Sequence, residues 1–190
     1  MITVDEIRNR LENTLTPKRL THSLNVMNTA VEMSKVYGEN EKNAAVTGLI
    51  HDCARDICGE EIFRLCEKFN IAIDDVTRVQ PKLLHGHIGA QIARLEYGIS
   101  DESILKAVFY HTLGHENMSM LEKIVFIADY IEPGRDFPEV DKIRKKAENS
   151  LEKALIVGFE STILLLISKK QRIYPLTILA RNALLEEISK

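Results

Sequence analysis

The stretch Ala44-Ala45-Val46-Thr47-Gly48-Leu49-Ile50 is apolar and runs directly into the polar pair His51-Asp52. If the stretch is helical, neighbouring side chains diverge by about 100°. The helix has no solvated face at this point, so the two side chains cannot both reach water. Burying a carboxylate without a partner is very costly, so the two polar side chains need partners. A metal ion is one such partner.

Helical signals dominate the chain and strand signals are scarce. Thr3 with Glu6 forms a capping-box pattern that predicts the start of a first helix. Thr16-Pro17 predicts the start of a second helix, and Gly38 predicts its end. Residues 70–81 have no helical period and are predicted as loop. Apolar spacing predicts the remaining helices at about 41–50, 60–69, 84–97, 101–110, 120–131, 139–168 (either continuous or broken near Ser150) and 175–188.

Composition narrows the class of protein. The chain has 190 residues, 45% of them hydrophobic, which is enough for one soluble domain with a sizeable core. Its formal net charge of -3 provides no basic coat for nucleic acid. An apolar run such as Ile163–Ile167 is far too short to span a bilayer. We therefore expect a single all-α domain over residues 1–190, without nucleic-acid or membrane partners.

The cysteines and the N-terminus bear on location. The chain has three cysteines, an odd number, and none of them forms a CxxC pair. This usage predicts neither a disulfide framework nor a zinc ribbon, and it is typical of a reducing compartment. The first six residues are partly acidic and lack the apolar core of a signal peptide. Together these features predict a cytoplasmic protein.

Four further polar residues lie in or beside apolar helical segments, namely His22, His85, His111 and Asp129. Asp129 is the clearest case, because it interrupts the apolar run Ile124–Ile131. Taken singly, each has a structural explanation: a hydrogen-bonded core histidine, or a capping or solvated aspartate. With the opening pair they supply four imidazoles and two carboxylates. Such a set suits iron, manganese or zinc.

The number of these residues favours two metals over one. A single four-coordinate ion would leave two of the six side chains unused, whereas two ions sharing a carboxylate would use them all. Metal pairs about 3.5–4 Å apart are the usual device for in-line displacement at phosphorus. The alternative is a purely structural helical protein whose polar side chains are satisfied by hydrogen bonds.

The order and surroundings of these residues resemble the HD-domain phosphohydrolase superfamily, and more closely its bacterial YqeK family. The likeness extends from about Pro17 to Asn182 and implies a single-domain helical bundle of the HD type. That fold would have a core at about residues 17–135 and C-terminal helices at 138–190. The segments that carry the resemblance are His51-Asp52-Cys53-Ala54-Arg55, Leu83-Leu84-His85-Gly86, Tyr110-His111-Thr112-Leu113-Gly114 and Ala128-Asp129-Tyr130-Ile131-Glu132-Pro133-Gly134-Arg135.

The resemblance implies a di-iron centre, although manganese and zinc suit the same ligands. Members of the family hydrolyse diadenosine tetraphosphate symmetrically, so a bridging hydroxide would attack a central phosphorus and release two ADP. A dinucleoside polyphosphate substrate, a nucleoside diphosphate product and a homodimer follow from the same likeness. One metal would be held by His22, His51, Asp52 and Asp129, and the other by His85 and His111, with Asp52 bridging.

A polyphosphate substrate needs local cations in a slightly acidic protein. Arg55 follows the opening pair, Lys82 precedes His85 by three residues, and Arg135 ends the Asp129 segment. We expect all three to contact phosphate, with arginine better suited to bidentate contacts. Their alternative role is an ordinary solvated surface charge. Arg55 and Arg135, together with the bridging Asp52, are the predicted catalytic residues.

Four polar residues near these segments have less defined roles. Asp56 and Glu132 are predicted to orient ligand imidazoles or water, or to pair with the nearby arginines. His115 is a candidate phosphate contact or general acid, and its alternative is an exposed loop histidine. His87 has no motif that assigns it to the metals, so a solvent-facing or supporting role is expected.

Two other functions remain open. The chain could be a different HD phosphohydrolase that acts on nucleoside monophosphates, cyclic nucleotides or alarmones. Single-metal HD enzymes need only the equivalents of His22, His51-Asp52 and Asp129, so the presence of His85 and His111 disfavours them. The chain could instead be a non-catalytic nucleotide sensor, which the complete ligand set disfavours.

Overall fold

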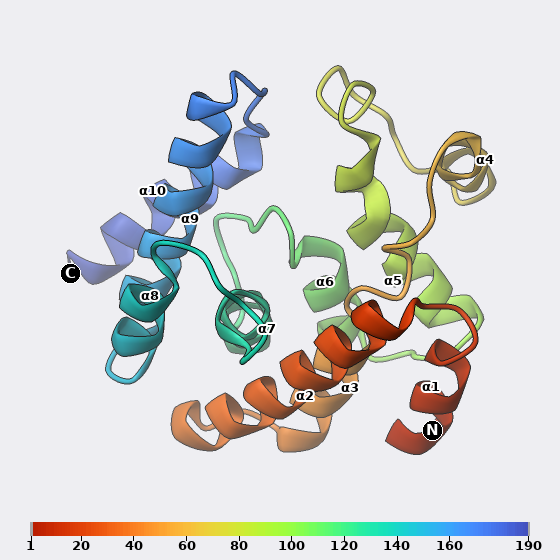
Figure 1. Cartoon of the computed structure of the whole chain (residues 1–190), viewed down its shortest axis with the longest axis horizontal. Helices are drawn as coiled ribbons and strands as arrows, with labels where there is room; N and C mark the ends of the chain where they lie inside the picture. The colour runs from red at the N-terminus through yellow and green to blue at the C-terminus, as the bar shows by residue number, and fades with distance from the viewer. Residues whose placement is uncertain (1, 190) are drawn as a thin grey trace.

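The computed structural model describes residues 2–189, and within that range the regular secondary structure is all helical, with no strand (Figure 1). The all-α class predicted from the sequence is confirmed. The described part contains ten α-helices and one 3₁₀ helix: α1 Val4–Leu11, α2 Pro17–Tyr37, α3 Glu41–Ile50, α4 Glu60–Lys68, η1 Pro81–Leu84, α5 His85–Leu95, α6 Glu102–Tyr110, α7 Met120–Ile131, α8 Val140–Ala147, α9 Leu151–Ser168 and α10 Pro175–Ile188.

Helix ends follow local capping chemistry. Thr3 and Glu6 form the capping box that opens α1, and Gly38 ends α2 with a φ of 72°. This left-handed conformation favours glycine because it has no Cβ. Residues 139–168 form two helices, because the Ser150 hydroxyl accepts a hydrogen bond from Lys153 N at 3.2 Å and caps α9. The alternative with a break near Ser150 is therefore correct.

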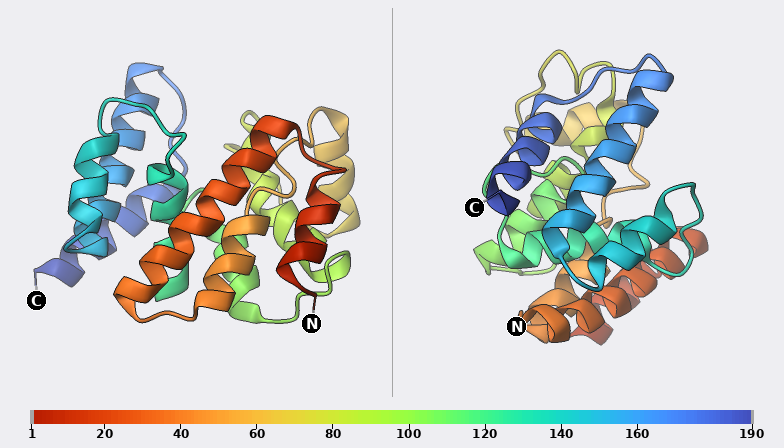
Figure 2. Two further views of the ribbon diagram at one scale, coloured as in Figure 1. Left: turned by 60° about the horizontal axis from the view of Figure 1, so that its bottom comes forward. Right: turned by 90° about the vertical axis from the view of Figure 1, so that its left-hand side faces the viewer.

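Helix α7 lies at the centre of the fold. It packs against α2, α3 and α6 on the N-terminal side and against α8 and α9 on the C-terminal side (Figures 1 and 2). Its Ile124, Phe126 and Ile127 are almost completely buried. Burying large apolar side chains on several faces is the main stabilising contribution to such a helix. A polar residue on α7 is consequently held in a well-defined position.

The helices α2 and α3 form the most extensive helix pair of the described structure. Gly48 permits their close approach, since a Cβ at this position would lie 2.8 Å from Met27 Cα. The buried apolar residues form one cluster that extends from Ile7 on α1 to Leu184 on α10. None of the described helices is both long and apolar enough to cross a membrane.

Candidate metal centre

The six predicted ligands come from five helices and converge on one place. His22 lies on α2, His51-Asp52 follows the end of α3, and His85 is the first residue of α5. His111 follows the end of α6, and Asp129 lies near the end of α7. All are buried except Asp129, which is partly buried. The structure thus brings together residues that are up to 107 positions apart in the sequence.

Each of the four imidazoles is anchored through Nδ1. Three of them donate to the backbone carbonyl three residues earlier, a contact that a histidine at a helix end makes readily. In the fourth, Nδ1 of His22 lies 3.1 Å from Glu132 Oε1. A proton on Nδ1 leaves Nε2 of a neutral ring as the lone-pair donor, as metal binding requires. The carbonyl contacts are 2.7 Å for His51 to Gly48, 2.6 Å for His85 to Lys82 and 2.7 Å for His111 to Val108.

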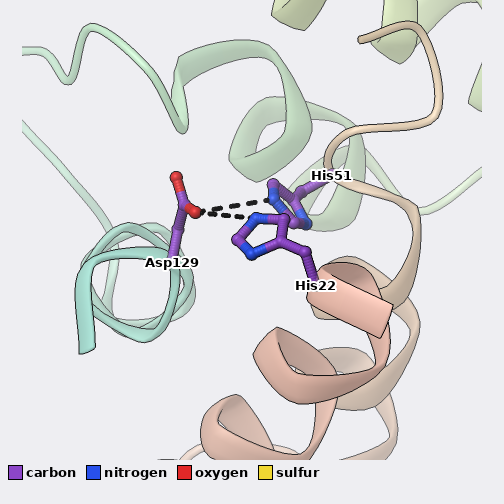
Figure 3. A group of neighbouring side chains, drawn as sticks. All are labelled: His22, His51 and Asp129. Atoms are coloured by element: carbon purple, nitrogen blue, oxygen red, sulfur yellow. Dashed lines mark ion pairs between the residues drawn. The ribbon is translucent and has the colours of Figure 1, made fainter. Parts of the chain in front are cut away.

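One oxygen of Asp52 faces the first group of ligands. Oδ2 lies 3.8 Å from Nε2 of His22 and 3.8 Å from Nε2 of His51. Oδ1 of Asp129 completes this group at 3.0 Å from His22 Nε2 and 3.9 Å from His51 Nε2 (Figure 3). His22, His51 and Asp129 offer ligand atoms that all lie within 4.8 Å of one another. This spacing would allow them to hold one ion.

The other oxygen of Asp52 faces the second group. Oδ1 lies 3.2 Å from His85 Nε2 and 3.4 Å from His111 Nε2. The two Nε2 atoms are 2.9 Å apart. Because both rings donate through Nδ1 to carbonyl oxygens, neutral rings would direct two lone pairs at each other. A shared cation satisfies such an arrangement, and the hydroxyl of Thr112, 3.1 Å and 3.0 Å away, can donate to only one of them at a time.

Unpaired nitrogen atoms provide a separate indication that these side chains can bind a metal. Nε2 of His22 and Nε2 of His51 are buried and have no hydrogen-bond partner of regular geometry, although that of His22 lies 3.0 Å from Asp129 Oδ1. A buried polar atom without a partner costs about 1–3 kcal/mol. Both atoms belong to the group that includes Asp129. Their environment, together with a donor set of imidazoles and carboxylates, fits a metal of the iron, manganese or zinc type.

The electrostatics keep His51 and both aspartates in metal-binding forms, whereas at His22 the effect of burial is outweighed by the Asp129 carboxylate, which raises the pKa of that imidazole. Burial lowers the pKa of His51 to about 4, so its ring is neutral near pH 7. Burial alone would raise the pKa of Asp52, but the surrounding imidazoles, His51 first, hold it well below its usual value. Burial is likewise outweighed at Asp129, where His22 and His51 lower the pKa. Both aspartates are therefore ionised.

Two of the predicted arginines border the centre. Arg135 donates to the carboxylate of Asp129, and its Nε donates to the Asp129 carbonyl at 2.7 Å. An amino group of Arg55 lies 3.1 Å from Nδ1 of His85. Both arginines line a cavity of about 430 Å³ that opens over Asp52 and the two histidines of the second group. Polar groups converging on one cavity define the place where an anionic ligand would bind.

A third arginine was missed by the sequence analysis. Arg19 lines the same cavity, with Nη1 3.7 Å from Asp52 Oδ2 and Nε 3.8 Å from Asp56 Oδ1. It precedes His22 by three residues on α2, and residues three apart share a helix face. The three-residue spacing between Arg19 and the predicted ligand His22 could have indicated that Arg19 lies near the metal centre.

The two predicted supporting carboxylates have different surroundings. Glu132 is buried and contacts a ligand directly through His22; it also accepts from Asn25 Nδ2 at 2.9 Å and from Gly134 N at 2.6 Å. Asp56 accepts from the backbone N–H of Thr16 at 3.0 Å. It therefore holds the start of α2 and Arg19, whereas Glu132 orients an imidazole.

Three further sequence candidates lie away from the cavity. The Lys82 side chain is exposed, and it is the Lys82 carbonyl that contacts His85. His115 Nε2 is 2.8 Å from Glu122 Oε1, which ties it to the start of α7. His87 packs against Phe109 with ring centroids 4.0 Å apart, and its Nδ1 is buried without a partner. Among residues 2–189, the lining of the 430 Å³ cavity includes none of these three.

A comparison with protein-family models identifies the class of protein. The HD domain model matches residues 19–134, which contain all six converging ligands. This match covers more than half of the chain. The chain therefore belongs to the HD-domain family.

Individual relatives place it more narrowly, in the YqeK family of HD-domain proteins. A Halalkalibacterium halodurans protein named bis(5'-nucleosyl)-tetraphosphatase, symmetrical, is 41% identical over 173 residues, covering 91% of this chain and 92% of that protein. A Bacillus subtilis protein of the same name is 39% identical over 168 residues, covering 88% and 90%. A crystal structure from Clostridium acetobutylicum, described as a predicted HD superfamily hydrolase involved in NAD metabolism, has a TM-score of 0.95 and 44% identity, covering 98% and 99%.

Proposed function

We propose that this protein hydrolyses diadenosine tetraphosphate symmetrically and releases two ADP. The relatives that match about nine-tenths of the chain carry the name of this activity. The observation that carries the proposal is the position of Asp52, whose two oxygens face two different groups of imidazoles. A carboxylate so placed is suited to bridge two metal ions, which is the arrangement used for displacement at phosphorus.

In this proposal, one ion would be held by His22, His51, Asp52 and Asp129, and the other by Asp52, His85 and His111. Iron is the metal proposed, and manganese or zinc would suit the same donors. When bound, the pair would supply an activated water and neutralise negative charge on phosphoryl oxygens. The part of the protein is to orient the ligands through the Nδ1 contacts and to keep both aspartates ionised.

The arginines would hold the substrate. Arg55, Arg135 and Arg19 line the cavity above the ligands and present fork-shaped donors to phosphate. Their charge would stabilise the negative charge that grows on the phosphoryl oxygens. Lys82 and His115 are weaker candidates for this role, because one side chain is exposed and the other is bonded to Glu122. The ADP leaving group is stable enough that the reaction does not require a dedicated acid from the protein.

Three further features belong to the proposal. The chain is proposed to act as one HD-type domain over residues 1–190, as a homodimer, and in the cytoplasm. The apolar cluster from α1 to α10 supports the single domain. The dimer and the location rest on the family resemblance and on the sequence composition.

The test is a product analysis with the metal-loaded protein. Diadenosine tetraphosphate is incubated with the protein, and the nucleotides are separated by anion-exchange chromatography. The proposal predicts two ADP for each substrate consumed and no reaction with the Asp52→Ala variant. Formation of ATP and AMP would contradict symmetrical cleavage.

A substrate panel separates the proposed activity from related ones. It should include nucleoside monophosphates, cyclic nucleotides, alarmones and a dinucleotide of the NAD type, because the Clostridium acetobutylicum relative is described as involved in NAD metabolism. Faster turnover of any of these than of the tetraphosphate would assign a different substrate. Tight binding of the tetraphosphate without turnover by the metal-loaded protein would indicate a sensor.

A further inference from the structure

A second cavity, of about 550 Å³, continues from the metal centre along α9. Tyr130, Phe137 and Leu165 line both this groove and the cavity over the ligands. The remainder of the groove is bordered mainly by Pro138, Leu164 and the Ser161-Thr162 pair. The polar cavity over the candidate metal centre therefore adjoins a largely apolar one.

The apolar side chains of this groove are unusually accessible. Leu165 is 51% exposed and Leu164 is 65% exposed, although both lie on the same helix as the fully buried Phe159. Exposed apolar area of this kind becomes favourable when a ligand covers it. A ligand anchored in the metal centre would have to pass Leu165 to reach the groove.

Phe137 occupies the junction between cavities. Its half-buried ring lines the metal-centre cavity, the apolar groove and a third cavity of about 650 Å³ beside Arg19 and Arg135. An aromatic ring offers a flat face on which a nucleobase can stack. Phosphate-binding arginines and an aromatic face thus lie next to each other.

The segment that carries Phe137 is held in place by its surroundings. Arg144 on α8 donates to the carbonyl of Ile131 at 3.2 Å, of Glu132 at 3.2 Å and of Arg135 at 3.0 Å. The ring of Phe137 packs edge-on against Tyr130, with centroids 6.1 Å apart. A surface ordered before the ligand arrives loses less entropy on binding.

The floor of the groove is also fixed. The Tyr130 hydroxyl is hydrogen-bonded to the Thr162 hydroxyl, which joins α7 to α9 within the lining of the groove. Tyr130 directly follows the ligand Asp129 in the sequence. Because Asp129 and Tyr130 are neighbours on the buried helix α7, the position of the groove relative to the metal centre is fixed.

We propose that this groove binds one adenine base of the substrate, stacked on Phe137 and covered on its other side by Leu165. The α- and β-phosphates of the same half would then lie between the groove and Arg135. This inference rests on the proposed function for the identity of the base. The groove would favour a purine ring because its walls bury apolar area and supply an aromatic face.

The connection with the metal centre argues for a ligand of that centre as the occupant. A second copy of the chain seated on Leu165 and Phe137 would cover residues that line the metal-centre cavity, and so would obstruct it. A base tethered to bound phosphates reaches the groove without obstructing anything. Adenine is therefore the occupant that fits the shared lining.

The test compares a nucleotide with its base-free counterpart. Binding of ADP and of inorganic pyrophosphate to the metal-loaded protein is measured by calorimetry, so turnover is not required. Stacking of a base on an aromatic residue is worth about 1–3 kcal/mol, which corresponds to a factor of about 5 to 150 in affinity. Phe137→Ala should weaken ADP binding by such a factor and leave pyrophosphate binding unchanged. Phe137→Leu should fall between the two.

A matched control is available on α9. Ile167 is 58% exposed and contributes to neither the groove nor the metal-centre cavity. Ile167→Ala should leave both ligands unaffected, whereas Leu165→Ala should weaken ADP alone. If Phe137→Ala does not fold, Phe137→Leu and Leu165→Ala decide the matter, because Leu165 is too exposed to be needed for the core.

Several results would overturn the inference. Unchanged ADP affinity in Phe137→Ala would exclude stacking, and equal weakening of ADP and pyrophosphate would show that Phe137 only supports Arg135. A dimer that dissociates on Leu165→Asp with ADP affinity intact would assign the groove to contacts between copies. If the protein fails to hydrolyse diadenosine tetraphosphate, the proposed function fails, while the contrast between ADP and pyrophosphate still tests the groove.

Discussion

The substitution Gly86→Ala tests whether close packing of α5 against α6 builds the second ligand group. A Cβ at Gly86 would lie 2.7 Å from the Phe109 carbonyl oxygen, against the 3.4 Å at which ordinary van der Waals contact begins. The two helices would have to separate by about 0.7 Å. His85 begins α5 and His111 follows α6, so this separation acts directly on the pair whose Nε2 atoms are 2.9 Å apart.

The expected effects follow from that displacement. Metal–ligand distances tolerate only about 0.2 Å, so the second ion of the proposed pair should be lost and the metal content should fall from the proposed two ions per chain towards one. A misplacement approaching 1 Å at a catalytic centre costs about 100-fold in rate, and we expect a loss of that order. Overpacking costs about 1–3 kcal/mol, partly offset by about 1 kcal/mol of helix propensity, so Tm should fall by only a few degrees.

The assay combines elemental analysis of the purified protein with the rate of diadenosine tetraphosphate hydrolysis at saturating metal. Gly89→Ala is the matched control, since Gly89 lies one turn along α5 and faces the same helix. A Cβ there would meet Cys53 Sγ at 3.4 Å and Val108 Cγ1 at 3.5 Å, which is ordinary contact. Gly89→Ala should keep both metals and full activity. Two metals and wild-type activity in Gly86→Ala would refute the reasoning.

Three other substitutions probe the surroundings of the centre. Glu132→Gln removes the charge that orients His22, and we expect metal affinity to fall by about 10- to 100-fold in a competition with a chelator; unchanged affinity would exclude this orienting role. Arg19→Met should raise KM by about tenfold with metal content retained, because the side chain lines the cavity without belonging to the ligand set; a lost metal would show a structural role instead. Lys123 forms ion pairs at 3.1 Å with Glu152 and at 2.6 Å with a glutamate of α10. Burial opposes these charges but is outweighed at both residues. The two glutamates raise the pKa of Lys123, and a backbone N–H together with Lys123 lowers the pKa of Glu152. The stability from a depressed glutamate pKa is present above its ordinary value of 4.5 and is lost as the pH falls, so Lys123→Met should lower Tm at pH 7 and much less at pH 3. An equal loss at both pH values would contradict this assignment.

Helix boundaries were predictable because they depend on neighbours in the sequence. The capping box of Thr3 and Glu6 and the left-handed Gly38 are local devices, and both occur where the sequence indicated them. The start of α5 is less local. The sequence predicted a helix from about residue 84, whereas a 3₁₀ turn over Pro81–Leu84 precedes a helix that begins at His85. The 3₁₀ turn places the Lys82 carbonyl where it can accept a hydrogen bond from Nδ1 of His85.

The choice of ligand residues was predictable for a different reason. His51, Asp52 and Asp129 are polar residues at the edge or in the middle of apolar helices, and such placement is costly without a partner. Their arrangement depends on tertiary packing. Which oxygen of Asp52 faces which group of histidines is decided by the meeting of α2, α3, α5, α6 and α7, which no local pattern contains.

Backbone and long-range contacts account for what the sequence analysis did not foresee. Lys82 was selected for its charge, but the structure uses its carbonyl, a group that every residue possesses. Asp56 was predicted to orient ligands or to pair with nearby arginines; it lies 3.8 Å from Arg19, and its additional contact with the Thr16 backbone, 40 residues away, was not foreseen. Arg19 resembled an ordinary surface charge on α2 until the fold placed it beside Asp52.

The central claim is that one bridging carboxylate assembles two metals that act together on diadenosine tetraphosphate. A metal titration of the metal-free protein, followed by the rate of ADP formation, tests it most directly. The account predicts that activity reaches its plateau at two metal equivalents per chain. A plateau at one equivalent, with no further gain on adding the second, would contradict it.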